Sequence, residues 1–90
     1  MLKHFNITVT GKVQGVSFRV YTQTKAQKLG LCGFVCNMPN GNVYIEAEGE
    51  YSQLKELVEW CWIGSPRAIA SKVNVSENEI RDFTDFIIKR

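Results

Sequence analysis

The chain has 90 residues, of which 44% are hydrophobic and 22% are charged, and its formal net charge is +2. Compact domains typically hold about 100–150 residues, so we expect one domain over residues 1–90. The apolar runs are only a few residues long, which excludes a membrane-spanning helix, and residues 1–10 do not resemble a secretory signal peptide. We therefore expect a cytoplasmic protein that has no membrane partner.

The distribution of charge along the chain is uneven. Residues 1–45 contain five Lys and Arg residues and no Asp or Glu, whereas residues 46–90 contain six basic and nine acidic residues. A site built from residues 1–45 is therefore expected to have a positive electrostatic potential, which favours an anionic ligand.

Cysteine and histidine offer little for catalysis or metal binding. Three cysteines are an odd number, which does not suit a disulfide framework, and we interpret Cys32, Cys36 and Cys61 as small, mostly buried hydrophobic residues. A catalytic thiol needs a nearby histidine, and the only histidine is His4, which we expect at the surface of the first strand. The spacing of possible ligands predicts no metal site, and we expect no cofactor.

The first half of the chain predicts one helix among three strands. Phe5, Ile7 and Val9 alternate with polar residues, which is typical of a half-buried strand. Gly30 is a typical C-cap residue and ends the predicted helix. Pro39 lies in the turn that follows the second predicted strand. The predicted elements are a strand at about 4–10, a glycine turn at 11–18, a helix at about 20–29, a strand at about 31–37, a turn at 37–41 and a strand at 42–50.

The second half predicts another helix and two more strands. Leu54, Leu57, Val58 and Cys61 are spaced as the apolar stripe of a helix, which we place from about Ser52 to Gly64. Strands are expected at about 69–77 and 82–88. The resulting β-α-β-β-α-β order with a short fifth strand predicts an α+β fold, a ferredoxin-like α/β sandwich. Both helices then pack on one face of a mainly antiparallel sheet.

The remaining polar and aromatic residues of these elements are expected to have structural roles. Glu46, Glu48 and Glu50 alternate with small residues, so we expect them on the solvated face of the third strand. Trp60 and Trp62 are two residues apart on the predicted helix and should point to different sides, in the core or in an interface.

The segment "GKVQGVSFR", residues 11–19, has the features of an anion site. A glycine-containing turn that joins a strand to a helix directs consecutive backbone N–H groups inward, at the positive end of the helix dipole. Arg19 follows where the helix begins, and its planar guanidinium can bind two phosphate oxygens at once. The alternative is an ordinary turn followed by a solvated arginine. The segment lacks the lysine and serine of a nucleotide P-loop.

Asn37 ends the second strand and is the second candidate. If the first two strands bring their ends to the same edge of the sheet, its amide would face the glycine turn. An amide can orient a water molecule without acting as a strong base. The alternative is that Asn37 only shapes the turn toward Pro39.

The sequence resembles the acylphosphatase family over nearly its whole length. The resemblance rests on five segments in the family's order: "GKVQGVSFR" (11–19), "GFVCN" (33–37), "NG" (40–41), "GSP" (64–66) and "FTDFIIKR" (83–90). It implies hydrolysis of small acyl phosphates to a carboxylate and inorganic phosphate, with no metal, cofactor or covalent intermediate. Ser17, Cys36 and Asn40 stand at positions where many members of the family have other residues.

The resemblance also implies a role for each residue of the site. Arg19 is implied to bind the phosphate and Asn37 to position the water, so these two are the expected catalytic residues. The expected phosphate-binding residues are Gln14, Gly15, Val16, Ser17, Phe18 and Arg19. The expected partner is a small acyl phosphate, bound by a monomer that has no nucleic-acid partner.

Two other functions stay open as alternatives. "CGFVCN" is similar to the Gly-Phe-Val centre of an RNA-recognition motif, but that motif lies on a third strand and this segment is on the second. A net charge of +2 is also weak for RNA binding. The other alternative is an anion-binding module on the same fold that has no catalytic activity.

Overall fold

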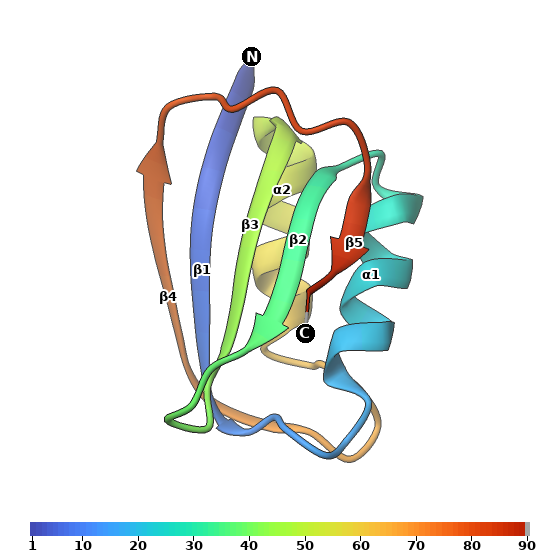
Figure 1. The fold of residues 1–90 in the computed structure, drawn as a ribbon, viewed down its shortest axis with the longest axis vertical. Helices are drawn as coiled ribbons and strands as arrows, with labels where there is room; N and C mark the ends of the chain where they lie inside the picture. The colour runs from blue at the N-terminus through green and yellow to red at the C-terminus, as the bar shows by residue number, and fades with distance from the viewer. Residues whose placement is uncertain (90) are drawn as a thin grey trace.

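A five-stranded sheet forms one layer of the molecule, and two helices cover one of its faces (Figure 1). The computed structural model describes residues 1–89. The sheet order is β4-β1-β3-β2-β5, which confirms the predicted ferredoxin-like α+β sandwich. The elements are β1 (Leu2–Lys12), α1 (Phe18–Lys28), β2 (Cys32–Asn37), β3 (Val43–Glu50), α2 (Tyr51–Cys61), β4 (Ile69–Asn78) and β5 (Phe86–Ile88).

The sheet is antiparallel except at one edge. β1 pairs with both β3 and β4, so that Ile7 lies opposite Ile45 on one side and Val75 on the other. β2 pairs antiparallel with β3 and parallel with the short strand β5. Within residues 1–89, no helix has the combination of length and apolarity that crossing a lipid bilayer requires.

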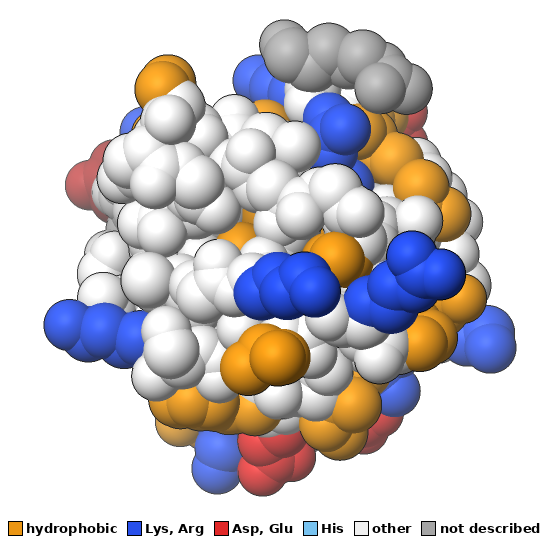
Figure 2. Space-filling view, turned by 90° about the horizontal axis from the view of Figure 1, so that it is seen from below, with side chains coloured by type: hydrophobic (Ala, Val, Ile, Leu, Met, Phe, Trp, Pro, Cys, Tyr) orange, Lys and Arg blue, Asp and Glu red, His pale blue; other side chains and the backbone are white. Residues whose placement is uncertain are grey.

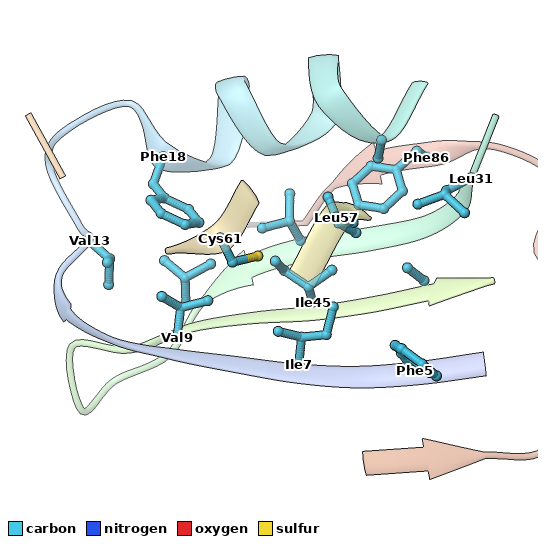
Figure 3. Close-up of a cluster of buried hydrophobic side chains, with 14 of the residues drawn as sticks. Phe5, Ile7, Val9, Val13, Phe18, Leu31, Ile45, Leu57, Cys61 and Phe86 are labelled. Carbon is cyan, nitrogen blue, oxygen red and sulfur yellow. The ribbon is translucent and has the colours of Figure 1, made fainter. Parts of the chain in front are cut away.

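The core lies between the sheet and the helices (Figure 3). Alternation along β1 and β3 turns one set of side chains toward the helices, and α2 adds its apolar stripe. Burying a Val, Leu, Ile or Phe side chain contributes roughly 1.5–3 kcal/mol, so this layer supplies most of the folding free energy. The central residues are Phe5, Ile7, Val9, Phe18, Val43, Ile45, Leu54, Leu57 and Cys61.

Two element boundaries differ from the prediction by three residues or more. Strand β5 begins at Phe86 and not at about residue 82, because Asp82 adopts the left-handed conformation with φ 58°, which an extended strand cannot contain. Helix α2 ends at Cys61, three residues before Gly64. Trp62 therefore lies outside the helix and is 51% exposed, whereas Trp60 packs against the ring of Phe18.

His4 is buried, so the expectation that it lies at the surface is wrong. Its Nδ1 lies 2.7 Å from Glu48 Oε2, and its Nε2 lies 3.0 Å from both Glu46 Oε1 and Asn6 Oδ1. The ring of Phe83 packs against the imidazole, with 5.7 Å between ring centroids. Residues 79–85 cover this face of the sheet, and the alternating pattern of β1 contains no signal for that.

The glutamates of β3 also differ from the prediction. Glu50 is exposed, as expected for the solvated face, and it pairs with the N-terminal ammonium group at 2.6 Å. Glu48 is only 7% exposed, and Glu46 is half-buried and accepts a hydrogen bond from the hydroxyl of Tyr44. Burial and this carboxylate raise the pKa of Tyr44 to about 12. The second face of the sheet is therefore a partly buried polar layer.

Opposing effects set the pKa of Glu48. Burial raises the pKa, but hydrogen bonds with His4 and with the backbone N–H groups of Arg81 and Phe83 lower it by more. The net result is a pKa below the ordinary value for glutamate. Glu48 therefore joins β3 to residues 79–85 as a carboxylate.

The cysteines are all free. Cys61 is buried in the core, and burial raises the pKa of its thiol to about 12, which makes it unreactive. Cys32 and Cys36 are half-buried, so the interpretation as buried hydrophobic residues is confirmed fully only for Cys61.

We predict that Glu48→Gln lowers the free energy of unfolding at pH 7 by about 1–3 kcal/mol, because a neutral amide replaces a buried hydrogen-bonded carboxylate. The folded pKa of Glu48 is depressed, so its contribution is present above the unfolded pKa and is lost as the pH falls through the folded pKa. Urea unfolding of both proteins should show a difference that shrinks as the pH is lowered. Equal stability at pH 7, or a difference that grows in acid, would contradict this assignment.

Candidate anion-binding site

Three loops meet at one end of the sheet, and the loop between β1 and α1 lies between the other two (Figure 1). We call residues 14–18 the cradle loop. On one side, Gln14 Nε2 donates hydrogen bonds to the carbonyl groups of Met38 at 2.7 Å and Asn42 at 2.9 Å. On the other side, Ser65 Oγ donates to the carbonyl of Val16 at 2.7 Å. These bonds hold the cradle loop from both sides.

The backbone of the cradle loop alternates in handedness. Gly15 has φ 73° and Ser17 has φ 63°, whereas Val16 between them is not in the positive-φ region. A Cβ atom on Gly15 would meet nothing within 4 Å, so glycine is needed there for its backbone conformation and not for space. A left-handed serine costs of order 1 kcal/mol. Such alternation points successive N–H groups to one side, which is the backbone geometry of anion-binding nests.

The N–H groups of the cradle loop are available to a ligand. From Gly15 to Val20, none of the six backbone N–H groups donates a hydrogen bond to any residue among 1–89. The last of them belong to the first turn of α1, where the helix dipole adds partial positive charge. Six consecutive free donors at a helix N-terminus favour an anion that has several oxygens.

A cavity of about 270 Å³ opens beside these donors. Arg19 reaches it from the first turn of α1, and Asn37 reaches it from the end of β2. The structure thus brings together the two residues that the sequence singled out. The cavity is lined by Val13, Gly15, Ser17, Phe18, Arg19, Val20 and Asn37.

Two of the expected phosphate-binding residues do not line this cavity. Gln14 uses its side-chain amide to bind the neighbouring turn. Val16 is buried, and its carbonyl is held by Ser65. Their side chains support the cradle loop, and any contact with an anion would come from their backbone.

Asn37 has an unusual environment. Its Oδ1 atom is buried and has no hydrogen-bond partner among the residues that the structure describes. Leaving a buried oxygen unpaired costs roughly 1–3 kcal/mol, so such an atom indicates a position where a bound molecule completes the hydrogen bonding. The ladder of β2 with β3 holds the backbone of Asn37 opposite Val43, which fixes where the amide lies.

Three chain segments at this end of the molecule carry positive charge only. Residues 11–20, 36–43 and 62–72 contain Lys12, Arg19, Arg67 and Lys72, and no Asp or Glu. Figure 2 views the molecule from the end that carries these segments, with Lys and Arg side chains over the middle of the view and acidic side chains toward its rim. The cavity lining contains no carboxylate or histidine, and within residues 1–89 there is no group of three His, Cys, Asp or Glu that could hold a metal ion.

The sequence did not predict how Phe18, Gly64 and Ser65 support the cradle loop. Phe18 is buried against Trp60, with 5.5 Å between ring centroids. A Cβ on Gly64 would lie 2.6 Å from the Phe18 ring, so only glycine allows this approach. Gly64 and Ser65 are part of the segment "GSP", which contributed to the resemblance, and Gly64 was expected only to end the second helix; neither was predicted to support the cradle loop.

These features define an α+β domain with a candidate anion-binding loop, and comparison with known proteins places it in a family. The acylphosphatase family model matches residues 5–88. The acylphosphatase of Marinobacter nauticus is 48% identical over 86 residues, which cover 94% of each chain. The crystal structure of the Bacillus subtilis acylphosphatase covers 100% of both chains with a TM-score of 0.96 and 37% identity. The structure of an acylphosphatase from Coxiella burnetii matches with a TM-score of 0.95 and 41% identity, over 98% of this chain and 93% of that one.

The chain therefore belongs to the acylphosphatase family. The resemblance drawn from the five sequence segments is confirmed, and so is the prediction of an enzyme of this family.

We predict that Ser65→Ala weakens the binding of inorganic phosphate about three- to tenfold, because the carbonyl of Val16 loses its buried donor and the nest is less well held. Phosphate titration followed by backbone amide shifts in NMR spectra measures this affinity. Ser71→Ala is the matched control, since Ser71 donates a similar bond to Thr10 outside the site. Equal weakening by both variants would show that the effect is not specific to the cradle loop.

Proposed function

We propose that this protein hydrolyses small acyl phosphates to a carboxylate and inorganic phosphate. The observation that carries the proposal is the run of free N–H groups from Gly15 to Val20 beside Arg19 and Asn37. Membership of the acylphosphatase family supports the reaction. The roles given below to individual residues are part of the proposal.

Binding of the phosphoryl group depends on fixed donors. Its oxygens accept hydrogen bonds from the cradle-loop N–H groups and a bidentate pair from the guanidinium of Arg19. Because no acidic side chain lines the cavity, no negative charge opposes the anion. As charge shifts among the phosphoryl oxygens in the transition state, donors that are already oriented stabilise it without reorganisation.

Attack on phosphorus requires a water molecule in line with the leaving group. The buried Oδ1 of Asn37 accepts a hydrogen bond from that water and orients it. The water oxygen forms a new bond to phosphorus as the bond from phosphorus to the acyl oxygen breaks. The carboxylate leaves with that electron pair, and the proton of the water passes to a phosphoryl oxygen.

A carboxylate is a stable leaving group, so the reaction does not need a strong general base. This accounts for a cavity whose lining has an amide and a guanidinium but no Asp, Glu or His. The proposed mechanism is independent of metal ions and has no covalent intermediate. The same chemistry would not serve a phosphate monoester, whose alkoxide leaving group needs protonation.

One pair of assays tests the proposed function. Hydrolysis of benzoyl phosphate in the presence of EDTA would support the enzyme. Phosphate binding without turnover would instead support an anion-binding module, and loss of activity in EDTA would contradict metal independence. If neither turnover nor binding is observed, the proposal is wrong and the RNA-binding alternative is the next to examine.

We predict that Arg19→Lys lowers kcat/KM for benzoyl phosphate by about 100-fold or more, because an ammonium group cannot reproduce the planar pair of hydrogen bonds. Steady-state kinetics measure the loss. Arg81→Lys is the matched control, because Arg81 lies beyond β4 and lines neither the cavity nor its loops. Activity of Arg19→Lys close to wild type would remove Arg19 from the mechanism.

We predict that Asn37→Ala lowers kcat by about 100-fold and changes the affinity for inorganic phosphate less than about threefold, since Asn37 acts on water and not on phosphate. Kinetics and a phosphate titration separate the two effects. Asn74→Ala, on the exposed edge strand β4, serves as the control. Loss of phosphate affinity with an unchanged kcat would reverse the assignment.

A further inference from the structure

A second cavity, of about 180 Å³, adjoins the first on the other flank of the cradle loop. Gly15 and Ser17 line both cavities, so the two cavities are separated only by this part of the cradle loop. The second cavity is lined by Gly15, Val16, Ser17, Tyr21, Pro66 and Arg67.

The two cavities lie on opposite sides of the loop. Asn37 lines only the first cavity, and Arg67 lines only the second. The hydrogen bonds of the cradle loop agree with this arrangement. Gln14 binds the β2–β3 turn on one side, and Ser65 from the α2–β4 loop binds Val16 on the other. A molecule that extends away from Asn37 across the loop therefore meets Arg67.

Arg67 is exposed and makes no hydrogen bond or ion pair with another residue in the described part of the chain. No acidic residue occurs anywhere in residues 62–72 to compete for its guanidinium. Tyr21 and Pro66 form apolar walls beside it. A short apolar chain that ends in a carboxylate matches this combination, since arginine forms bidentate pairs with carboxylates.

We propose that the second cavity binds the acyl group of the substrate and that Arg67 selects acyl groups carrying a second carboxylate. This inference rests on the proposed function. In an in-line displacement the leaving group departs opposite the attacking water. With the water held at Asn37, the bond from phosphorus to the acyl oxygen points over Gly15 and Ser17 into the second cavity. The acyl carboxylate leaves there with the bonding electron pair.

The favoured substrate class is therefore the monoacyl phosphates of short dicarboxylic acids. The far carboxylate pairs with Arg67 in the ground state and in the transition state alike. Arg67 thus determines specificity without taking part in the reaction, and it should affect KM more than kcat.

Succinyl phosphate and butyryl phosphate test this proposal, because both have a four-carbon acyl group and only the first has a second carboxylate. The wild-type enzyme should show a higher kcat/KM for succinyl phosphate. Arg67→Gln should lower that value about tenfold, which corresponds to a charge-assisted hydrogen bond, and leave butyryl phosphate nearly unchanged. The exposed position of Arg67 makes misfolding of the variant no obstacle.

Lys12→Gln is the matched control, because it removes the same charge from the same end of the molecule and lines neither cavity. An equal loss in both variants would overturn the proposal in favour of a general effect of charge. Equal kcat/KM for the two substrates, unaffected by Arg67→Gln, would overturn the subsite and leave the hydrolytic function intact. If neither substrate is hydrolysed, the proposed function itself is wrong, and the subsite with it.

Discussion

The six backbone N–H groups from Gly15 to Val20 are the constraint on which the site depends. Donors without protein acceptors lower the stability of a loop, so the chain on both sides of them must hold it in place. Gln14 and Ser65 do so by hydrogen bonds, and Phe18 does so by packing in the core. The stable fold of the sandwich thus holds the free N–H groups in the orientation that an anion requires. Donors that are oriented before the ligand binds are called preorganised.

The sheet architecture was predictable because its signals are local. The alternation of Phe5, Ile7 and Val9 and the stripe from Leu54 to Cys61 each describe an element with one buried face. Arg19 and Asn37 were also predictable as candidates, since Arg19 follows a glycine turn where the helix begins and Asn37 ends a strand before a turn. The burial of His4 was not predictable from the sequence. It depends on residues 79–85, which are far from β1 in sequence and have no periodic pattern.

The support of the cradle loop was hidden for a similar reason. Ser65 and Gly64 lie nearly fifty residues from the loop that they contact. A serine in a turn has many uses, and only the folded chain selects one of them. Gln14 lies inside the signature segment and was expected to bind the phosphate. Its side-chain amide binds the β2–β3 turn, so a phosphate contact through its backbone stays a prediction. The sequence motif indicates the region of the site, but it does not show which side chains of that region form hydrogen bonds within the fold.

The polar cluster of His4, Glu46 and Glu48 lies at the opposite end of β1 and β3 from the cradle loop (Figure 1). Free-energy changes at sites that share no partners usually add independently. Substitutions in this cluster should therefore change the stability of the fold and its pH dependence while the chemistry of the cradle loop stays the same. The two ends of β1 thus serve separate purposes, one for the response of the fold to acid and one for the site.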